Sequence, residues 1–178
     1  MAQNKAIILI GGQDYGKTGT IDKWCELKGQ VRKAGGLTTF VIQINGKDEF
    51  IIISSSSIQE QKHYNLEKIK KDILSRMERY PKIAKKEGFE RFIWIMAFTI
   101  GTTSNSIKTE QVTAPIELLE EKGFDVLKIY MNRIDGEGVE QFGEINRFAT
   151  QIKDKEIPSN KEWERQAKEL DEYITEFV

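Results

Sequence analysis

The sequence predicts an α/β fold of three layers, in which helices cover both faces of a mostly parallel, five-stranded sheet that contains one β-hairpin. Segments typical of strands and helices alternate in the order strand, helix, hairpin, helix, strand, helix, strand, helix. The first apolar segment, from Ala6 to Ile10, is short, uninterrupted and followed by two glycines, which is typical of a strand buried on both faces of a parallel sheet. The length of 178 residues fits one ordinary domain, so we expect a single domain over residues 1–178.

The first half of the chain is expected to supply a helix and a hairpin. The segment from Thr18 to about Lys33 predicts a helix that Gly35-Gly36 ends. The segments from Thr38 to Ile44 and from Glu49 to Ser54 are rich in β-branched and aromatic residues, and Asn45-Gly46 between them is a strong hairpin signal. The residues predicted on the apolar face of the helix are Ile21, Trp24, Cys25, Leu27 and Val31.

The second half of the chain predicts two further strands, from Phe92 to Phe98 and from Val126 to Met131. Ser159 and Glu162 form a capping-box pattern before an apolar stripe. The three predicted helices are a long one from Leu66 to Tyr80 that Pro81 breaks or kinks, a short one from Pro115 to Lys122, and one that follows Ser159 and carries Trp163 and Ala167 on its apolar stripe.

In parallel α/β sheets, ligands bind beyond the carboxyl ends of the strands. We therefore expect the functional residues in the segments that follow Ile10, Ile53, Phe98 and Met131. The hairpin turn is expected at the opposite end, provided that the third strand runs parallel to the first.

The composition limits the classes of partner. Lys and Arg total 27 against 28 Asp and Glu, and a net charge of −1 argues against a general electrostatic affinity for nucleic acid or membrane. The apolar segments are too short to span a bilayer, and Cys25 is the only cysteine, so we expect a cytoplasmic protein without disulfides or structural zinc. Residues 60–91 hold ten Lys or Arg against six Asp or Glu, which permits a protein or nucleic-acid partner on the long helix.

The segment GGQDYGKT directly after the first strand fits the G-x-x-x-x-G-K-S/T pattern through Gly11, Gly16, Lys17 and Thr18. Glycines let the backbone wrap around an anion, and the following helix offers its positive N-terminal end. Lys17, which we expect to be exposed in the loop, can meet the β- and γ-phosphates, and the Thr18 hydroxyl can bind Mg²⁺. The pattern therefore predicts a phosphate-binding loop.

The segment KAIILIGGQDYGKTGT resembles the Walker A segment of the P-loop NTPase superfamily. The resemblance implies a P-loop NTPase-like sandwich that binds a nucleoside triphosphate and Mg²⁺, with ATP favoured over GTP. Lys17 and Thr18 would be the catalytic residues, and Thr18 the metal ligand. The residues expected to line the loop are Gly11, Gly12, Gln13, Asp14, Tyr15, Gly16, Lys17, Thr18 and Gly19.

The second motif of that superfamily, an acidic residue at the end of an apolar strand, has no obvious counterpart. Serines 54–57 follow the third predicted strand, Thr99 follows the fourth, and Glu60 is the nearest downstream acid at the expected working end. Two alternatives follow. Either Ser54 contacts the metal or its water while another acid substitutes, or the protein binds nucleotide and hydrolyses it poorly.

Asn132, Arg133 and Asp135 follow the fifth predicted strand in a sequence similar to the N-K-x-D motif with which GTPases read guanine. This similarity adds Asn132 and Asp135 to the candidate nucleotide-binding residues. Thr38 or Thr39 could be a switch threonine before the second strand. The D-x-x-G motif of GTPases is absent.

Three classes of function remain open from the sequence. The first is an NTPase. The second is a small-molecule or polynucleotide kinase, in which Arg133 and Arg147, on either side of a glycine-containing loop, would close over the phosphates. The third is a GTPase-like switch or a nucleotide-binding module with little turnover. The phosphoryl acceptor and the oligomeric state are not indicated by the sequence.

Overall fold

The computed structural model describes residues 3–12, 16–32, 37–54, 57–63, 65–100, 110–131, 146–147 and 159–178. One sheet runs through the centre with strand order β2-β3-β4-β1-β5-β6, and every neighbouring pair is parallel except β2 and β3. The predicted five strands are thereby confirmed, and a two-residue sixth strand adds to them. The strands are β1 (Lys5–Gly11), β2 (Thr38–Ile44), β3 (Lys47–Ile53), β4 (Ile93–Thr99), β5 (Asp125–Tyr130) and β6 (Asn146–Arg147).

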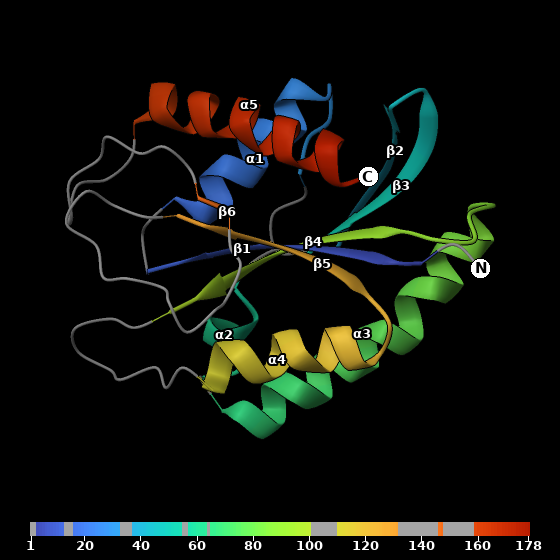
Figure 1. Cartoon of the computed structure of the whole chain (residues 1–178), viewed down its shortest axis with the longest axis vertical. Coiled ribbons are helices and arrows are strands. Elements are labelled where there is room, and N and C mark those ends of the chain that lie inside the picture. Colours follow the sequence, from blue (N-terminus) through green and yellow to red (C-terminus); the bar gives the residue numbers. More distant parts are fainter. Residues whose placement is uncertain are drawn as a thin grey trace.

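Helices cover both faces of this sheet, as Figure 1 shows, with α1 and α5 on one face and α3 and α4 on the other. Along β1, Ile8 and Ile10 pack toward α3 and α4, whereas Ile7 and Leu9 pack toward α1 and α5. This alternation gives two separate cores and confirms the α/β sandwich. The helices are α1 (Lys17–Leu27), α2 (Ile58–Gln61), α3 (Leu66–Lys86), α4 (Glu110–Glu121) and α5 (Asn160–Phe177).

The hairpin prediction is confirmed. Asn45 and Gly46 have φ angles of 52° and 76°, the left-handed conformations that a two-residue turn between twisted strands requires. Because β3 is parallel to β4, and β4 to β1, the hairpin turn lies at the amino edge of the parallel strands. The carboxyl ends of β1, β3, β4 and β5 meet at the opposite edge.

The predicted end of the first helix was wrong. Gly29 has a φ of 69°, and Gln30 N donates to Cys25 O at 2.9 Å, so the chain leaves the helix in a Schellman turn soon after Leu27. As a result Val31, predicted on the apolar face, is 85% exposed.

Of the two outcomes predicted at Pro81, a break is wrong, because α3 continues through the proline to Lys86. A proline inside a helix costs about 3 kcal/mol. Tyr80 and Ala84 are both buried on the core side of α3, while Pro81 is exposed, so packing on both sides of the proline outweighs that cost. α4 likewise begins five residues before Pro115.

Candidate functional site

The segment that resembles a phosphate-binding loop lies between β1 and α1, at the carboxyl edge of the sheet. Gly11 is the last residue of β1 and pairs with Thr99 of β4, and Gly12 is buried beside it. Gly16 precedes α1 with a φ of 85°, a conformation that favours glycine. The structure therefore has the predicted buried strand before residues 13–15 and the predicted helix after them.

Lys17 was expected to be exposed, and it is instead buried, with 6% of its surface accessible. Its Nζ donates to Gly12 O at 2.6 Å and to Gly11 O at 3.0 Å. Gly11 O also accepts a hydrogen bond from Ile100 N at 3.1 Å. The ammonium group is therefore held at the point where β1 leaves the sheet beside the end of β4.

Glycine at position 19 is required by the packing of α5 against α1. A Cβ atom at Gly19 would lie 2.6 Å from Trp163 Cε2, so any larger side chain forces the indole to move. One residue on, Thr20 Oγ1 donates to Gln166 Oε1 at 2.9 Å. Trp163 Nε1 is buried and has no hydrogen-bond partner in the part of the chain that the structure describes. Thr18, between these contacts and Lys17, is exposed.

The N-terminus of α1 differs in charge from those of the two long helices. Asn65 caps α3 and Ser159 caps α5 through their side chains, and each of these helices has a glutamate in its first turn. α1 follows Gly16, which has no side chain to serve as an acceptor, and its first turn holds no acid. The partial positive charge of this helix end adds to that of Lys17 and favours an anion.

Ser54, one of the alternatives for a metal contact, has structural partners. Its Oγ accepts hydrogen bonds from Trp94 Nε1 at 2.7 Å and from Arg76 Nη1 at 2.9 Å, and the residue is buried. β4 lies between β3 and β1, so two strand spacings, about 10 Å, separate Ser54 from the start of the loop. The structure does not favour a role for Ser54 at the phosphates.

Glu60 lies closer to the loop through a contact that the sequence did not reveal. It belongs to α2, and its Oε1 accepts a hydrogen bond from Thr99 Oγ1 at 2.6 Å. The fully buried Gln59 accepts from Thr99 N at 3.3 Å and from Ser57 Oγ at 2.9 Å, and it donates to Gln111 O at 3.3 Å. Gln59 was missed because nothing in a four-residue helix marks its glutamine as a core residue.

Of the features that suggested a GTPase, the structure places only the candidate switch threonines, and they are not next to β1. Thr38 and Thr39 lie inside β2 rather than before it, and β2 is three strands away from β1, or about 14 Å. Arg147 is in β6, of which only the backbone is described. The candidate residues that lie outside the described residues are Gln13, Asp14, Tyr15, Asn132, Arg133 and Asp135.

Cys25 is a core residue, as predicted. It is buried on α1, and burial raises the pKa of its thiol to about 12. Across the described ranges, no cluster of three or more His, Cys, Asp or Glu side chains could hold a metal ion, and no helix is long and apolar enough to cross a membrane.

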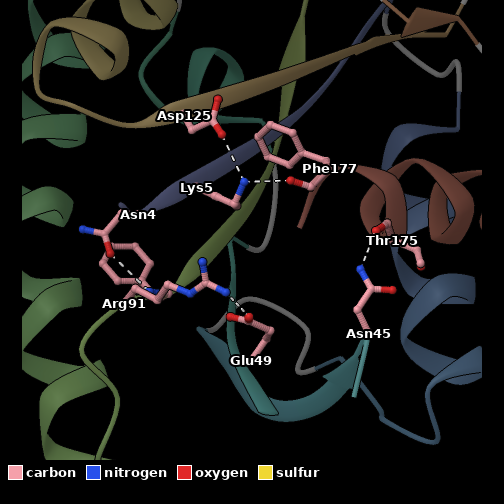
Figure 2. A network of polar contacts seen from close by, with 9 residues as sticks. Asn4, Lys5, Asn45, Glu49, Arg91, Asp125, Thr175 and Phe177 are labelled. Carbon is pink, nitrogen blue, oxygen red and sulfur yellow. Dashed lines mark hydrogen bonds and ion pairs between the residues drawn. The ribbon is translucent and has the colours of Figure 1, made fainter. Parts of the chain in front are cut away.

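The amino edge of the sheet holds a different kind of polar network (Figure 2). Lys5 Nζ donates to Asp125 Oδ2 at 3.0 Å and to Phe177 O at 2.7 Å, and it lies 4.1 Å from the centre of the Phe177 ring. Arg91 forms an ion pair with the buried Glu49. The Lys5 contacts join β1 and β5 to α5, and the Arg91–Glu49 pair joins β3 to the segment before β4, all at the edge away from the loop.

Comparisons with known proteins give no assignment: no family model matches the chain, and neither curated proteins nor solved structures gave a significant match. The chemistry of the site rests on its own residues.

Proposed function

We propose that the chain binds a nucleoside triphosphate with Mg²⁺ at the loop between β1 and α1, with ATP favoured over GTP, and that it hydrolyses the triphosphate or transfers its terminal phosphoryl group. The observation that supports this most is the position of Lys17. Its ammonium lies 3.0 Å from Gly11 O and 2.6 Å from Gly12 O, beside the uncapped start of α1. A cation and a helix N-terminus at the same point favour an anion such as a phosphate.

The side chains at the start of α1 suit a triphosphate with its metal. Lys17 would neutralise charge on the β- and γ-phosphates. Mg²⁺ usually keeps several waters and takes few protein ligands besides phosphate oxygens, so the exposed hydroxyl of Thr18 is a sufficient donor. When bound, the metal would neutralise the charge that develops on the phosphate oxygens.

Two reactions are compatible with the proposed site, and they differ in the phosphoryl acceptor. Water as the acceptor gives an NTPase, and a hydroxyl compound or polynucleotide gives a kinase. A GTPase-like switch is supported less, because Thr38 and Thr39 are three strands away from β1.

A thermal-shift comparison of ATP, GTP, ADP and GDP, each with and without Mg²⁺, tests the binding. A triphosphate at about 100 times its Kd stabilises a protein by about 2.7 kcal/mol, which raises the Tm of a chain of this size by about 5–10 °C. We expect the largest rise with ATP and Mg²⁺, and the same rise in Lys168→Ala, which removes an exposed lysine from α5. No rise with any of the four nucleotides would contradict the proposal.

A further inference from the structure

The end of β4 lies beside the start of the loop and contacts α2. Ile58 of α2 packs in the core on the α3 and α4 face of the sheet, opposite α1 (Figure 1). Thr99 is paired with Gly11, the residue from which the loop starts.

Glu60 is held at this position by its hydrogen bond from Thr99 Oγ1, at 2.6 Å. The neighbouring Gln59 fixes α2 to the end of β4, because its buried amide accepts from Thr99 N and donates to Gln111 O of α4. Glu60 itself is exposed. Its carboxylate is therefore both positioned and accessible. Thr99, to which it is hydrogen-bonded, pairs with Gly11 at the end of β1.

Two other acids at this edge are engaged with cations. Asp72 forms ion pairs with Arg76 and Lys62. Glu162 forms one with Arg165. Glu60 has no ion-pair partner among the described residues, and its hydrogen bond comes from a neutral hydroxyl, which leaves the carboxylate able to accept a proton.

We propose that Glu60 is the general base of this site, and this inference rests on the proposed function. The oxygen of a water molecule or of an acceptor hydroxyl forms a bond to the terminal phosphorus, and its proton passes to a carboxylate oxygen of Glu60. The bond from that phosphorus to the bridging oxygen breaks, and the nucleoside diphosphate leaves with the electron pair. Thr99 is the positioning residue that holds the carboxylate, and α2 thus supplies the acid that the end of β3 lacks.

The test compares Glu60→Gln with Glu67→Gln, which changes an exposed glutamate in the first turn of the next helix. Turnover is measured as phosphate release from ATP and Mg²⁺, and as label transfer to nucleosides, nucleotides and 5′-hydroxyl oligonucleotides. General-base catalysis is worth about 10²- to 10⁴-fold, so kcat should fall by that factor in Glu60→Gln and stay unchanged in Glu67→Gln. ATP affinity without Mg²⁺ should stay within about threefold in both, because Glu60 does not hold the nucleotide.

Thr99 provides a second readout that a merely structural role would not give. Thr99→Val removes the hydroxyl and keeps the shape, and it should lower kcat with little change in KM. Thr99→Ser keeps the hydroxyl and should restore most of kcat. Equal loss in both variants, accompanied by a lower Tm, would show a packing role and overturn the positioning role.

These outcomes distinguish a failure of the general-base inference from a failure of the proposed function. If the unaltered protein binds no nucleotide, the proposed function fails and the inference fails with it. If it binds ATP and Glu60→Gln turns over at the rate of the unaltered protein, only the inference fails. Binding without turnover toward water or any of these acceptors would likewise overturn the general base and leave the binding site intact.

Discussion

The two edges of the sheet place their charged side chains in different surroundings. At the amino edge, Lys5 contacts Asp125, and Arg91 contacts the buried Glu49, so opposite charges meet directly. At the carboxyl edge, Lys17 donates to backbone carbonyls and Glu60 accepts from a hydroxyl. The carboxyl edge also holds ion pairs, such as Asp72 with Arg76, so the comparison concerns the contacts of Lys17 and Glu60.

This difference indicates a division of roles. At the amino edge, Lys5 links β1 to Asp125 of β5 and to the end of α5, and Arg91 links the segment before β4 to Glu49 of β3; these contacts stabilise the fold. Lys17 and Glu60, at the carboxyl edge, belong to the proposed nucleotide site. Substitutions of the paired charges at the amino edge should therefore lower stability and leave nucleotide binding unchanged, whereas Lys17→Ala should lower nucleotide affinity and Glu60→Gln should lower kcat.

The largest effect on stability is expected from Arg91→Met. Glu49 is 2% exposed, and removing its partner leaves a buried carboxylate without a cation, which costs about 3–5 kcal/mol. Urea unfolding should show this loss, and Lys82→Met, an exposed site on α3, should show less than about 0.5 kcal/mol. A shift in ATP affinity larger than threefold in Arg91→Met would break the separation between the two edges.

A smaller loss of stability is expected from Gly19→Ala, and shortening Trp163 should turn this loss into a gain. The new Cβ would lie 2.6 Å from Trp163, and overpacking of this kind costs about 1–3 kcal/mol. In a Trp163→Leu background the clash is reduced, and the better helix propensity of alanine should make the same substitution stabilising by up to about 1 kcal/mol. The four proteins of this cycle are compared by urea unfolding, and an unchanged sign would disprove the contact.

Removing a helix cap is expected to lower the free energy of unfolding by about 1 kcal/mol. Ser159 Oγ accepts from Glu162 N at 3.3 Å at the start of α5, and Asn65 Oδ1 accepts from Lys68 N at 3.0 Å at the start of α3. Ser159→Ala and Asn65→Ala should each cost about 1 kcal/mol in urea unfolding. Substitutions by glycine should cost only a few tenths, and equal losses for alanine and glycine would argue against the caps.

The smallest effect concerns Cys25 and appears only at alkaline pH. Burial raises the pKa of the folded thiol to about 12 from a value of 9.0. The unfolded chain loses this proton above about pH 9 while the folded chain keeps it, so the contribution is complete below that pH and decreases toward pH 12. Cys25→Ala should flatten the alkaline decline of the unfolding free energy, and rapid reaction of the native thiol with a disulfide reagent at pH 8 would contradict its burial.

The elements that local pattern determines could be predicted from the sequence. β1 follows from an uninterrupted apolar run, and the hairpin from Asn45-Gly46, because these signals need no knowledge of neighbours. The end of α1 was misplaced because a single glycine, Gly29, is as strong a stop as the later Gly35-Gly36 pair. The prediction of a break at Pro81 was wrong because the burial of Tyr80 and Ala84 outweighs the cost of a proline inside the helix.

The candidate site was predictable only in part. The motif from Gly11 to Thr18 predicts the strand, the helix and the cation. The burial of Lys17 accompanies its hydrogen bonds to Gly11 O and Gly12 O, which the motif does not indicate. The contact between Glu60 and Thr99 depends on β3 lying beside β4, and its closeness to the loop depends on β4 lying beside β1. No local pattern in the sequence indicates this strand order. Sequence separation hides such pairs until the sheet is known.

The central claim is that Lys17 binds the phosphates of a nucleoside triphosphate at the carboxyl edge. Calorimetric titration of ATP with Mg²⁺ into the unaltered protein, Lys17→Ala and Lys168→Ala tests it most directly, with circular dichroism showing that each is folded. Because two or more charge-assisted hydrogen bonds are lost, affinity should fall at least about a hundredfold in Lys17→Ala and be unchanged in Lys168→Ala. Equal affinity in all three folded proteins would contradict the claim.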